Sequence, residues 1–196
     1  SYIVPIMNVE DYLGIALDSL TNQTMEDMEF ILLNDGSTDG SMMIMREYAE
    51  IDKRFVIVDK ENTGYGHTMN MGIDMARGDY IGILEPDDFV EHNMFERLWQ
   101  EASKHELDFV KSDFNNFEVN PDGTLKKKAV YLSLDGTYYN RTLCPGKEKE
   151  VFFFPINTWS GIYRKEFLNK HHIRHHETPG ASFQDNGFWF QTFCYG

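Results

Sequence analysis

Residues 80–88 read Tyr80-Ile81-Gly82-Ile83-Leu84-Glu85-Pro86-Asp87-Asp88, an apolar run that ends in three carboxylates within four positions. Successive apolar residues predict a strand that is buried on both faces of a sheet. The proline ends the strand, so the carboxylates lie at its carboxyl end, where ligands bind in open α/β sheets. Clustered carboxylates repel one another unless they share a cation, and their oxygen atoms suit Mg²⁺ or Mn²⁺. The stretch therefore predicts a site for a metal-bound diphosphate.

The first half of the chain alternates between predicted strands and predicted helices. Short apolar runs predict strands at 2–4, 30–33, 55–58 and 80–84. Apolar residues at spacings of three and four predict a helix after each strand, marked by Leu13 to Leu20, Met45 to Ala49, Met69 to Ala76 and Met94 to Ala102. This alternation predicts an α/β fold, with a Rossmann-like, mostly parallel sheet between two layers of helices.

The pattern changes after residue 110. Two turn signals, 120–123 and 135–136, lie in a polar stretch and predict hairpins or an insertion. Residues 151–154 predict a late strand, and residues 157–168 predict a turn followed by a helix. The aromatic run from Phe183 to Phe193 is expected to form a helix that faces the core rather than a platform for sugars.

Composition bounds the class of protein. The chain has 196 residues, of which 41% are hydrophobic, as in a globular domain. Its formal net charge of −14 argues against nucleic acid as a partner, because such a partner requires a basic surface. Cys144 and Cys194 have no metal-ligand spacing, which favours a reducing, cytoplasmic setting. The last residues carry no obvious terminator, so we expect the chain to be truncated at its C-terminus.

Three polar loops are expected to meet at the carboxyl edge of the sheet. They follow the first strand at 4–8, the second at 34–39 and the fourth at 85–88. The sequence Asn34-Asp35-Gly36-Ser37-Thr38-Asp39 is also what an ordinary turn and helix cap require. Three such loops at one edge favour a binding site over that simpler interpretation.

Taken in order, the motifs of the chain resemble those of family 2 glycosyltransferases, which have the GT-A fold. The matching motifs are Val4-Pro5 with Asn8-Val9, Asn34 to Asp39, Asn62-x-Gly64 with Asn70-x-Gly72, Gly78 to Ile81, and the acidic turn. The resemblance covers residues 1 to about 115, with a looser match from Trp159 to Trp189. It implies one structural domain, in which 1–115 bind the nucleotide-sugar and 116–196 form an acceptor-side region.

The resemblance also implies a donor site for a nucleotide-diphosphate sugar, usually linked to UDP. The matching positions for the nucleotide are Pro5, Asn8, Asp35, Asn62, Gly64, Glu85 and Asp87. Asp35 would accept a hydrogen bond from the uracil N3–H. The acidic turn matches the family's D-x-D element, so Asp87 would ligate Mn²⁺ or Mg²⁺, with Asp88 as a further ligand.

A later block resembles the family element that carries the catalytic base. Residues 179–186 read Pro-Gly-Ala-Ser-Phe-Gln-Asp-Asn, and Asp185 matches the base of an inverting transfer. Gln184 stands where the family has a carboxylate. Asp185 is alternatively only a first-turn residue favoured by the helix dipole, in which case Glu177 becomes the candidate base.

Two aromatic features stay open in the sequence. Trp159 is suited either to the core or to a sugar platform. His171, His172, His175 and His176 contain two pairs at helical spacing, which a zinc site would use. With no cysteine nearby, we expect these histidines to form a solvated polar surface instead.

The function implied by the resemblance is metal-dependent, inverting transfer of a hexosyl or N-acetylhexosaminyl group. The acceptor would be a glycan or a lipid-linked sugar in bacterial polysaccharide or cell-envelope synthesis, at the inner face of the membrane through parts outside this chain. One alternative is a degenerate module that binds nucleotide-sugar without turnover. Another is a nucleotidyltransferase, which would show a glycine-rich loop with a basic residue where this chain has Pro5-Ile6-Met7-Asn8.

Overall fold

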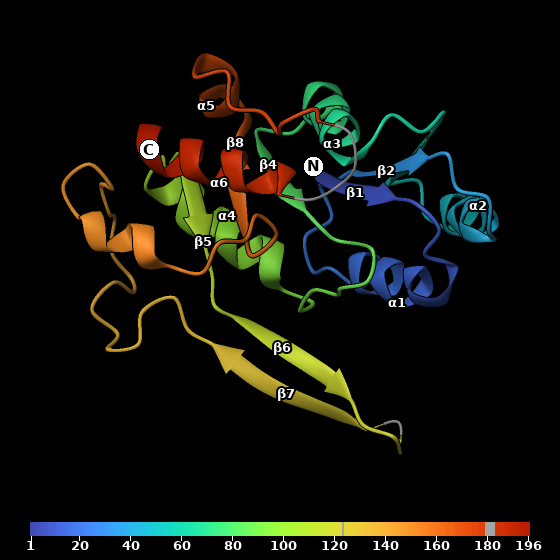
Figure 1. The fold of residues 1–196 in the computed structure, drawn as a ribbon, viewed down its shortest axis with the longest axis horizontal. Coiled ribbons are helices and arrows are strands. Elements are labelled where there is room, and N and C mark those ends of the chain that lie inside the picture. The colour runs from blue at the N-terminus through green and yellow to red at the C-terminus, as the bar shows by residue number, and fades with distance from the viewer. Residues whose placement is uncertain (123, 179–182) are drawn as a thin grey trace.

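A six-stranded sheet forms the centre of the computed structural model, which describes residues 1–122, 124–178 and 183–196 (Figure 1). The first four strands run parallel, and β8 is antiparallel to both of its neighbours, which confirms the mostly parallel sheet. In spatial order the strands are β3 (Phe55–Lys60), β2 (Phe30–Asp35), β1 (Tyr2–Ile6), β4 (Tyr80–Ile83), β8 (Gly161–Arg164) and β5 (Phe109–Lys111).

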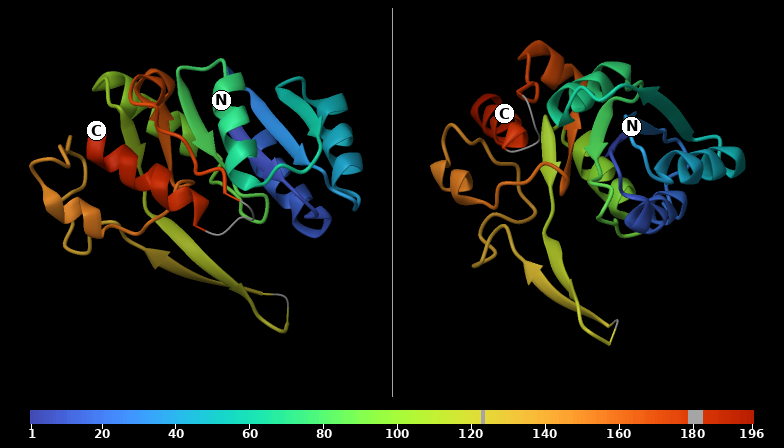
Figure 2. Two further views of the ribbon diagram at one scale, coloured as in Figure 1. Left: turned by 45° about the horizontal axis from the view of Figure 1, so that its top comes forward. Right: turned by 45° about the vertical axis from the view of Figure 1, so that its right-hand side comes forward.

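Helices cover both faces of the sheet, because every residue of β1, β2 and β4 is buried and alternate side chains point to opposite faces. Tyr2 and Val4 of β1 belong to one core, and Ile3 belongs to the other. The first core is closed by α1 (Glu10–Thr21), α2 (Ser41–Ile51) and α4 (Met94–Lys104). The second is closed by α3 (Tyr65–Met75), α5 (Lys165–Lys170) and α6 (Gln184–Tyr195) (Figure 2).

Two elements in the second half differ from the sequence prediction. Residues 151–154 do not form a strand, because Lys149–Phe153 is a short 3-10 helix, η1. Within 157–168 the turn is followed first by strand β8 and only then by α5. The four-residue β8 was missed because a run this short has no period of its own, and its pairing with β4 and β5 joins distant segments.

A two-stranded arm, made of β6 (Phe114–Val119) and β7 (Leu125–Val130), stands away from the body (Figures 1 and 2). Its turn lies where residues 120–123 predicted a hairpin, although Gly123 is outside the described residues. The second predicted turn is also present, since Gly136 has φ of 75° and Asp135 accepts a hydrogen bond from the Thr137 amide.

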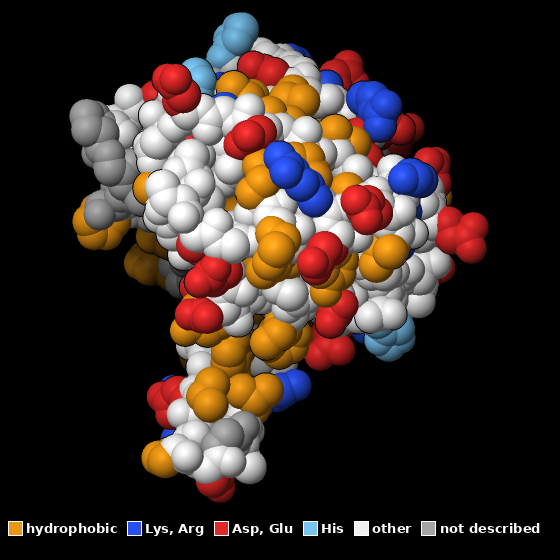
Figure 3. All heavy atoms as spheres, turned by 90° about the vertical axis from the view of Figure 1, so that its right-hand side faces the viewer, with side chains coloured by type: hydrophobic (Ala, Val, Ile, Leu, Met, Phe, Trp, Pro, Cys, Tyr) orange, Lys and Arg blue, Asp and Glu red, His pale blue; other side chains and the backbone are white. Residues whose placement is uncertain are grey.

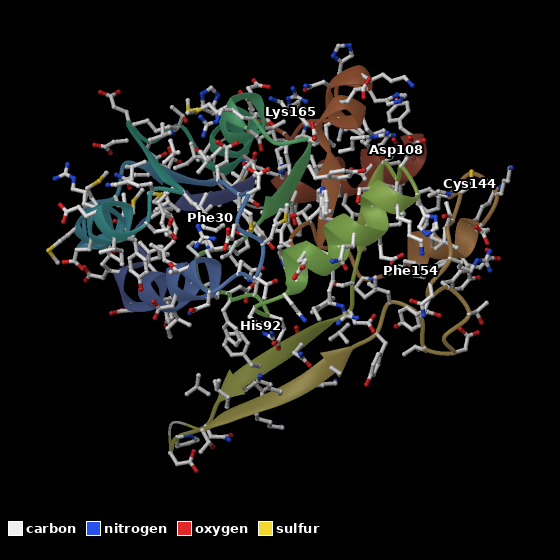
Figure 4. All side chains as sticks on the ribbon, turned by 180° about the vertical axis from the view of Figure 1, so that it is seen from behind. Phe30, His92, Asp108, Cys144, Phe154 and Lys165 are labelled. Atoms are coloured by element: carbon white, nitrogen blue, oxygen red, sulfur yellow. The ribbon has the colours of Figure 1, made fainter. Side chains whose placement is uncertain are left out.

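The aromatic run at the end of the chain forms α6, which faces the core as predicted. Phe188, Trp189 and Phe193 are buried, whereas Phe183 and Phe190 are exposed. The segment between β7 and β8 lies at the opposite end of the molecule from Phe30 of β2, as Cys144 and Phe154 show in Figure 4. Among the described residues, none of the helices has the length and apolar character needed to cross a bilayer.

We predict that Gly161→Ala destabilises the sheet at the junction of β8 and β5. A Cβ atom at Gly161 would lie 2.3 Å from the Val110 carbonyl oxygen, so the two strands would have to separate. We expect the free energy of unfolding to fall by roughly 1–3 kcal/mol, as for other overpacked sites, measured by urea denaturation.

Gly14→Ala is the matched control, because a Cβ atom there would meet only the Tyr48 hydroxyl at 4.0 Å. Gly14 lies inside α1, and replacing a helical glycine by alanine should stabilise the protein by up to about 1 kcal/mol. Equal effects of the two substitutions would contradict the close approach of β8 to β5.

Candidate functional site

The first two loops at the carboxyl edge of the sheet are joined by hydrogen bonds. Asn8, with φ of 53°, accepts a hydrogen bond from the Thr38 amide at 2.8 Å. Its own amide donates to the Ser37 hydroxyl at 3.0 Å. Because β1 and β2 are parallel neighbours, their ends bring Asn8 beside the 34–39 loop as the sequence predicted.

The carboxylates of Asp39 and Glu10 bind backbone amides at the starts of α1 and α2 and so join the two loops. Asp39 accepts hydrogen bonds from the Ser41 and Glu10 amides, both at 3.0 Å, and so caps α2 and α1 at once. Glu10 in turn accepts a hydrogen bond from the Gly40 amide. Asp39 therefore does serve the cap role that the sequence left open, and the caps fix the loop that carries Asp35.

Asp35 is buried and ties the end of β2 to the loop before α3. Its carboxylate accepts hydrogen bonds from the amides of Thr63 at 2.8 Å and Gly64 at 3.1 Å, and it pairs with the Lys60 ammonium group. Burial alone would raise the pKa of Asp35, but the bonds from Lys60 and Thr63 lower it. Asp35 is thus a fixed negative charge, and Gly64 turns the chain into α3 with φ of 90°.

The acidic turn closes the site on the side of β4. The Asp88 amide donates to the Glu85 carbonyl at 3.0 Å, so residues 85–88 form a tight turn with Pro86 at its second position. The Glu85 carboxylate accepts a hydrogen bond from the Tyr65 hydroxyl at 2.6 Å. Asp87 is exposed and Asp88 is half-buried.

Burial and neighbouring charges raise the pKa of two carboxyl groups in this turn, Glu85 and Asp88. Burial raises the pKa of Glu85 to about 7, and the nearby charges of Asp87, Asp88 and Asp185 add to that effect against the Tyr65 hydrogen bond. Burial and the charge of Asp87 likewise raise the pKa of Asp88. The turn therefore concentrates negative charge that a cation would stabilise.

The donor set of the turn suits Mg²⁺ or Mn²⁺ held jointly with a diphosphate. Within the described residues, no group of three or more His, Cys, Asp or Glu side chains is arranged to hold a metal without other ligands. Ions of this kind are commonly bound by one or two carboxylates together with substrate phosphate oxygens. Asp87 and Asp88 provide such a pair at a sheet edge, so the residues present fit the group.

Asp185 lies in the first turn of α6 and belongs to the same site. It is half-buried, and its charge acts on Tyr65 and Glu85. The start of α6 is attached to α3 by the preceding residue, because the Gln184 side-chain carbonyl accepts a hydrogen bond from the Gly66 amide at 2.5 Å. The Gln184 amide group donates to the Thr178 carbonyl.

The surroundings of position 184 therefore favour an amide side chain over a carboxylate. One end of the Gln184 side chain meets a donor and the other end meets an acceptor, which an amide can satisfy and an ionised carboxylate cannot. The departure from the family's pattern at Gln184 has this local physical reason. Residues 179–182 of the same block lie outside the described residues.

Glu177, the alternative base, is exposed and already engaged. It accepts a hydrogen bond from the Asn70 amide group at 2.7 Å and pairs with His67 at 3.0 Å. These bonds from Asn70 and His67 lower the pKa of Glu177. Asn70 also bonds the His175 backbone in both directions, so it holds the 175–177 segment against α3.

The expectation of a solvated histidine surface is wrong for His175. Its ring is buried and stacks on Phe188, with centroids 4.5 Å apart, and burial lowers its pKa to about 3. It is therefore a neutral core residue, whereas His172 and His176 are exposed and His171 stacks on Tyr195. The cause is the α6 packing, which places Phe188 beside a residue that the sequence pattern alone groups with its polar neighbours.

The structure brings most of the predicted residues together at one edge. Pro5 is buried within β1, and Gly64 caps the start of α3. Asn62 is exposed, and its side-chain amide contacts the Met7 sulfur at 3.1 Å. Lys60 and Tyr65 were not among the residues predicted from the sequence. Lys60 could have been predicted, because parallel pairing of β2 and β3 sets Asp35 opposite Lys60 at the strand ends.

Comparison with known proteins identifies a family and a fold. A sequence model described as Glycosyl transferase family 2 matches residues 1–176. The putative glycosyltransferase EpsH of Bacillus subtilis (strain 168) is 32% identical over 177 residues, which cover 88% of this chain and 49% of EpsH. The chain thus spans about half the length of this relative.

Two solved structures share the fold at low sequence identity. S. aureus TarS 1-349 in complex with UDP-GlcNAc superimposes with a TM-score of 0.76 at 20% identity, covering 98% of this chain and 52% of that chain. The mannosyltransferase PcManGT from Pyrobaculum calidifontis, in complex with GDP-Man and Mn²⁺, gives 0.63 at 16% identity, covering 93% and 49%.

We predict that Glu85→Gln stabilises the metal-free protein at high pH. The folded-state pKa of Glu85, about 7, lies above the ordinary value of 4.5, so the folded state holds the proton more tightly than the unfolded state does. Ionisation of Glu85 therefore costs stability as the pH rises through this window, and glutamine removes that cost. Glutamine also keeps an acceptor oxygen for Tyr65.

In urea denaturation with a chelator, Glu85→Gln should exceed the wild type by about 1–3 kcal/mol near pH 8. Near pH 4, below both pKa values, the two proteins should differ little, because the wild-type carboxyl group is then mostly protonated in the folded and the unfolded state. A difference that stays the same at both pH values would show that Glu85 is not held in this environment.

Proposed function

The chain belongs to glycosyltransferase family 2, and on that premise we propose that it transfers a sugar from a nucleoside-diphosphate donor to a glycan or lipid-linked acceptor, with inversion and with a bound divalent metal. One observation carries the proposal. The loops after β1 and β2, the loop before α3 and the acidic turn meet at the carboxyl edge of one sheet, where open α/β folds bind ligands. The same proposal includes uridine as the base of the donor, the divalent metal at the acidic turn and the activation of the acceptor hydroxyl group.

The two parts of the domain divide this work. Residues 1–115 hold the donor, since the four polar loops all belong to them, and residues 116–196 carry the acceptor side and the base. A cytoplasmic location is supported by two free, exposed thiols, Cys144 and Cys194, which a reducing compartment preserves.

The nucleoside lies against the loops that Asp35 joins. Pro5 and Asn8 border it on one side, and Asn62 and Gly64 border it on the other. Asp35 keeps acceptor capacity on the oxygen that binds the Gly64 amide, which suits the N3–H donor of uracil. UDP-GlcNAc in the TarS complex and GDP-Man in the mannosyltransferase complex show that the fold accepts either base, and the Asp35 carboxylate favours uridine here.

The acidic turn holds the diphosphate through the metal. Asp87 and Asp88 would ligate Mn²⁺ or Mg²⁺ together with phosphate oxygens, while Glu85, fixed by Tyr65, borders the donor behind them. A bound ion would neutralise the charge that develops on the departing diphosphate.

Asp185 acts as the general base. An acceptor hydroxyl oxygen forms its bond to the anomeric carbon as the bond from that carbon to the diphosphate oxygen breaks, and the electron pair of the broken bond leaves with the diphosphate. The hydroxyl proton passes to the Asp185 carboxylate. The hydrogen bonds of Gln184 favour an active enzyme over a degenerate module. Its bonds to Gly66 and Thr178 hold the start of α6, and with it Asp185, near Glu85.

We predict that Asp87→Asn abolishes metal-dependent donor binding and leaves the fold intact. The substitution removes a metal-ligating charge from an exposed turn position, so the thermal unfolding temperature should stay unchanged. Calorimetric titration with UDP and Mn²⁺ should show at least a tenfold weaker affinity, or about 1.4 kcal/mol.

Asp27→Asn is the control, because Asp27 is another exposed aspartate on the loop before β2, at the opposite edge of the sheet from the acidic turn. This variant should bind UDP and Mn²⁺ as the wild type does. Unchanged affinity of Asp87→Asn for UDP and Mn²⁺ would show that Asp87 is not a metal ligand.

We predict that Asp185→Asn slows transfer by roughly a hundredfold to ten-thousandfold, the usual contribution of a general base. UDP affinity should change less than about twofold, because the base serves the acceptor and not the diphosphate. Steady-state release of UDP is measured with a UDP-sugar that the wild type turns over.

Glu177→Gln separates the two candidate bases, since Glu177 is already hydrogen-bonded to Asn70 and His67. It should retain most of the turnover. If Asp185→Asn keeps more than about a third of the rate while Glu177→Gln loses it, the base is Glu177. If the wild-type protein releases UDP from none of a panel of UDP-sugars, the chain is better explained as a degenerate module that binds nucleotide-sugar without turnover.

A further inference from the structure

A cleft separates the arm from the acidic turn. It has a volume of about 450 Å³ and is lined by Asp87 and Asp88 on one wall, by Asn115, Asn116 and Phe117 of β6 on the other, and by Tyr12 and Trp159. A smaller pocket of about 110 Å³ adjoins it and shares Asp88, Asn115, Phe117 and Trp159 with it. The volume falls within the range of roughly 300–1,000 Å³ that is usual for small-molecule sites.

Aromatic contacts attach the arm to the body. Phe117 packs on Phe89, with ring centroids 5.3 Å apart, and Phe114 meets Trp159 at 4.7 Å. Farther out, Val119 and Leu125 are exposed. An isolated two-stranded sheet is marginally stable in water, so the arm gains from a ligand that bridges it to the body. Figure 3 shows hydrophobic side chains along the arm where it leaves the body.

The side chains of the cleft suit a saccharide. Half-buried aromatic rings at Phe117 and Trp159 offer faces for the C–H groups of a pyranose ring. The exposed amides of Asn115 and Asn116 each provide donors and an acceptor for neighbouring hydroxyl groups. Trp159, which the sequence left between core and platform, thus lies with one side against Phe114 and another on the cleft.

The charge of the cleft selects the class of saccharide. Its lining includes the carboxylates of Asp87 and Asp88 and no lysine or arginine among the described residues. Lys127 lines the smaller pocket and not the cleft, and its ammonium group lies over the Phe89 ring, 5.9 Å from the centroid. A uronate or phosphate group in the cleft would face like charge in the metal-free protein. It would also do so in the loaded protein, because the two carboxylates and the donor diphosphate together outweigh the charge of one divalent ion. The cleft therefore disfavours anionic glycans.

We propose that the cleft between the arm and the acidic turn binds the body of an uncharged acceptor glycan, with Phe117 and Trp159 as ring platforms and Asn115 and Asn116 as hydroxyl partners. This inference rests on the proposed function. Asp87 and Asp88 belong to both the cleft and the proposed diphosphate site, so a glycan in the cleft lies next to the donor. Asp185 does not line the cleft, and the cleft therefore holds acceptor units beyond the one that reacts.

The test uses saturation-transfer NMR on the full chain with three tetrasaccharides: cellotetraose and chitotetraose, which are neutral, and a hyaluronan tetrasaccharide, which is anionic. At least one neutral probe should bind the wild type, and the anionic probe should bind at least tenfold more weakly. Phe117→Ala and Asn116→Ala should each weaken the neutral probe by roughly tenfold, the scale of one stacked ring or one good hydrogen-bonding side chain.

Val119→Ala is the control, because Val119 is on the same strand of the arm but outside the cleft. Asn116→Ala changes an exposed side chain and keeps the test valid if Phe117→Ala disturbs the arm. The inference is overturned if neither neutral probe binds, if the anionic probe binds better, or if Asn116→Ala and Phe117→Ala bind as Val119→Ala does.

Each titration is run with and without UDP and Mn²⁺, so that the two proposals fail separately. Loss of UDP binding with intact glycan binding would sink the donor site alone. Intact UDP binding with no glycan binding to the cleft would sink the acceptor inference alone.

Discussion

The rest of the site depends on the ion pair and hydrogen bonds of the buried Asp35 carboxylate. It holds Lys60 and the amides of Thr63 and Gly64, and so fixes the start of α3 against the end of β2. The next two residues of α3 then reach the other parts of the site. Tyr65 binds Glu85 of the acidic turn, and the Gly66 amide binds Gln184 ahead of Asp185. One buried charge thus sets the positions of the nucleotide loop, the metal turn and the candidate base together.

The same arrangement explains why so acidic a chain can bind a diphosphate. Asp35 is neutralised locally by Lys60 and backbone amides, so it adds little repulsion at the sheet edge. The carboxylates of the turn remain uncompensated: burial raises the pKa of Glu85, and repulsion from Asp87, Asp88 and Asp185 raises it further. A divalent ion would relieve this repulsion and attract the phosphates at once, which makes metal and donor binding interdependent.

The parts of the fold that the sequence predicted are those that local pattern controls. Buried runs such as 80–84 and the polar residues of 34–39 carry their own signals of strand, turn and cap, so β1 to β4 and the loops after them were found. The strand β8 and the bond between Gly66 and Gln184 were not, because each joins segments far apart in the chain. The identity of a partner across 118 positions is not encoded in either neighbourhood.

Hydrogen–deuterium exchange on addition of UDP and Mn²⁺ tests whether these loops form one site. We expect slower exchange in 5–10, 34–41, 61–68 and 85–90 together, with little change in the arm or in η1. Leaving out the metal should abolish the slowing in 85–90 first, because UDP reaches that turn through the ion. Slowing confined to one of these segments, or centred outside them, would show that the four loops do not form one binding site.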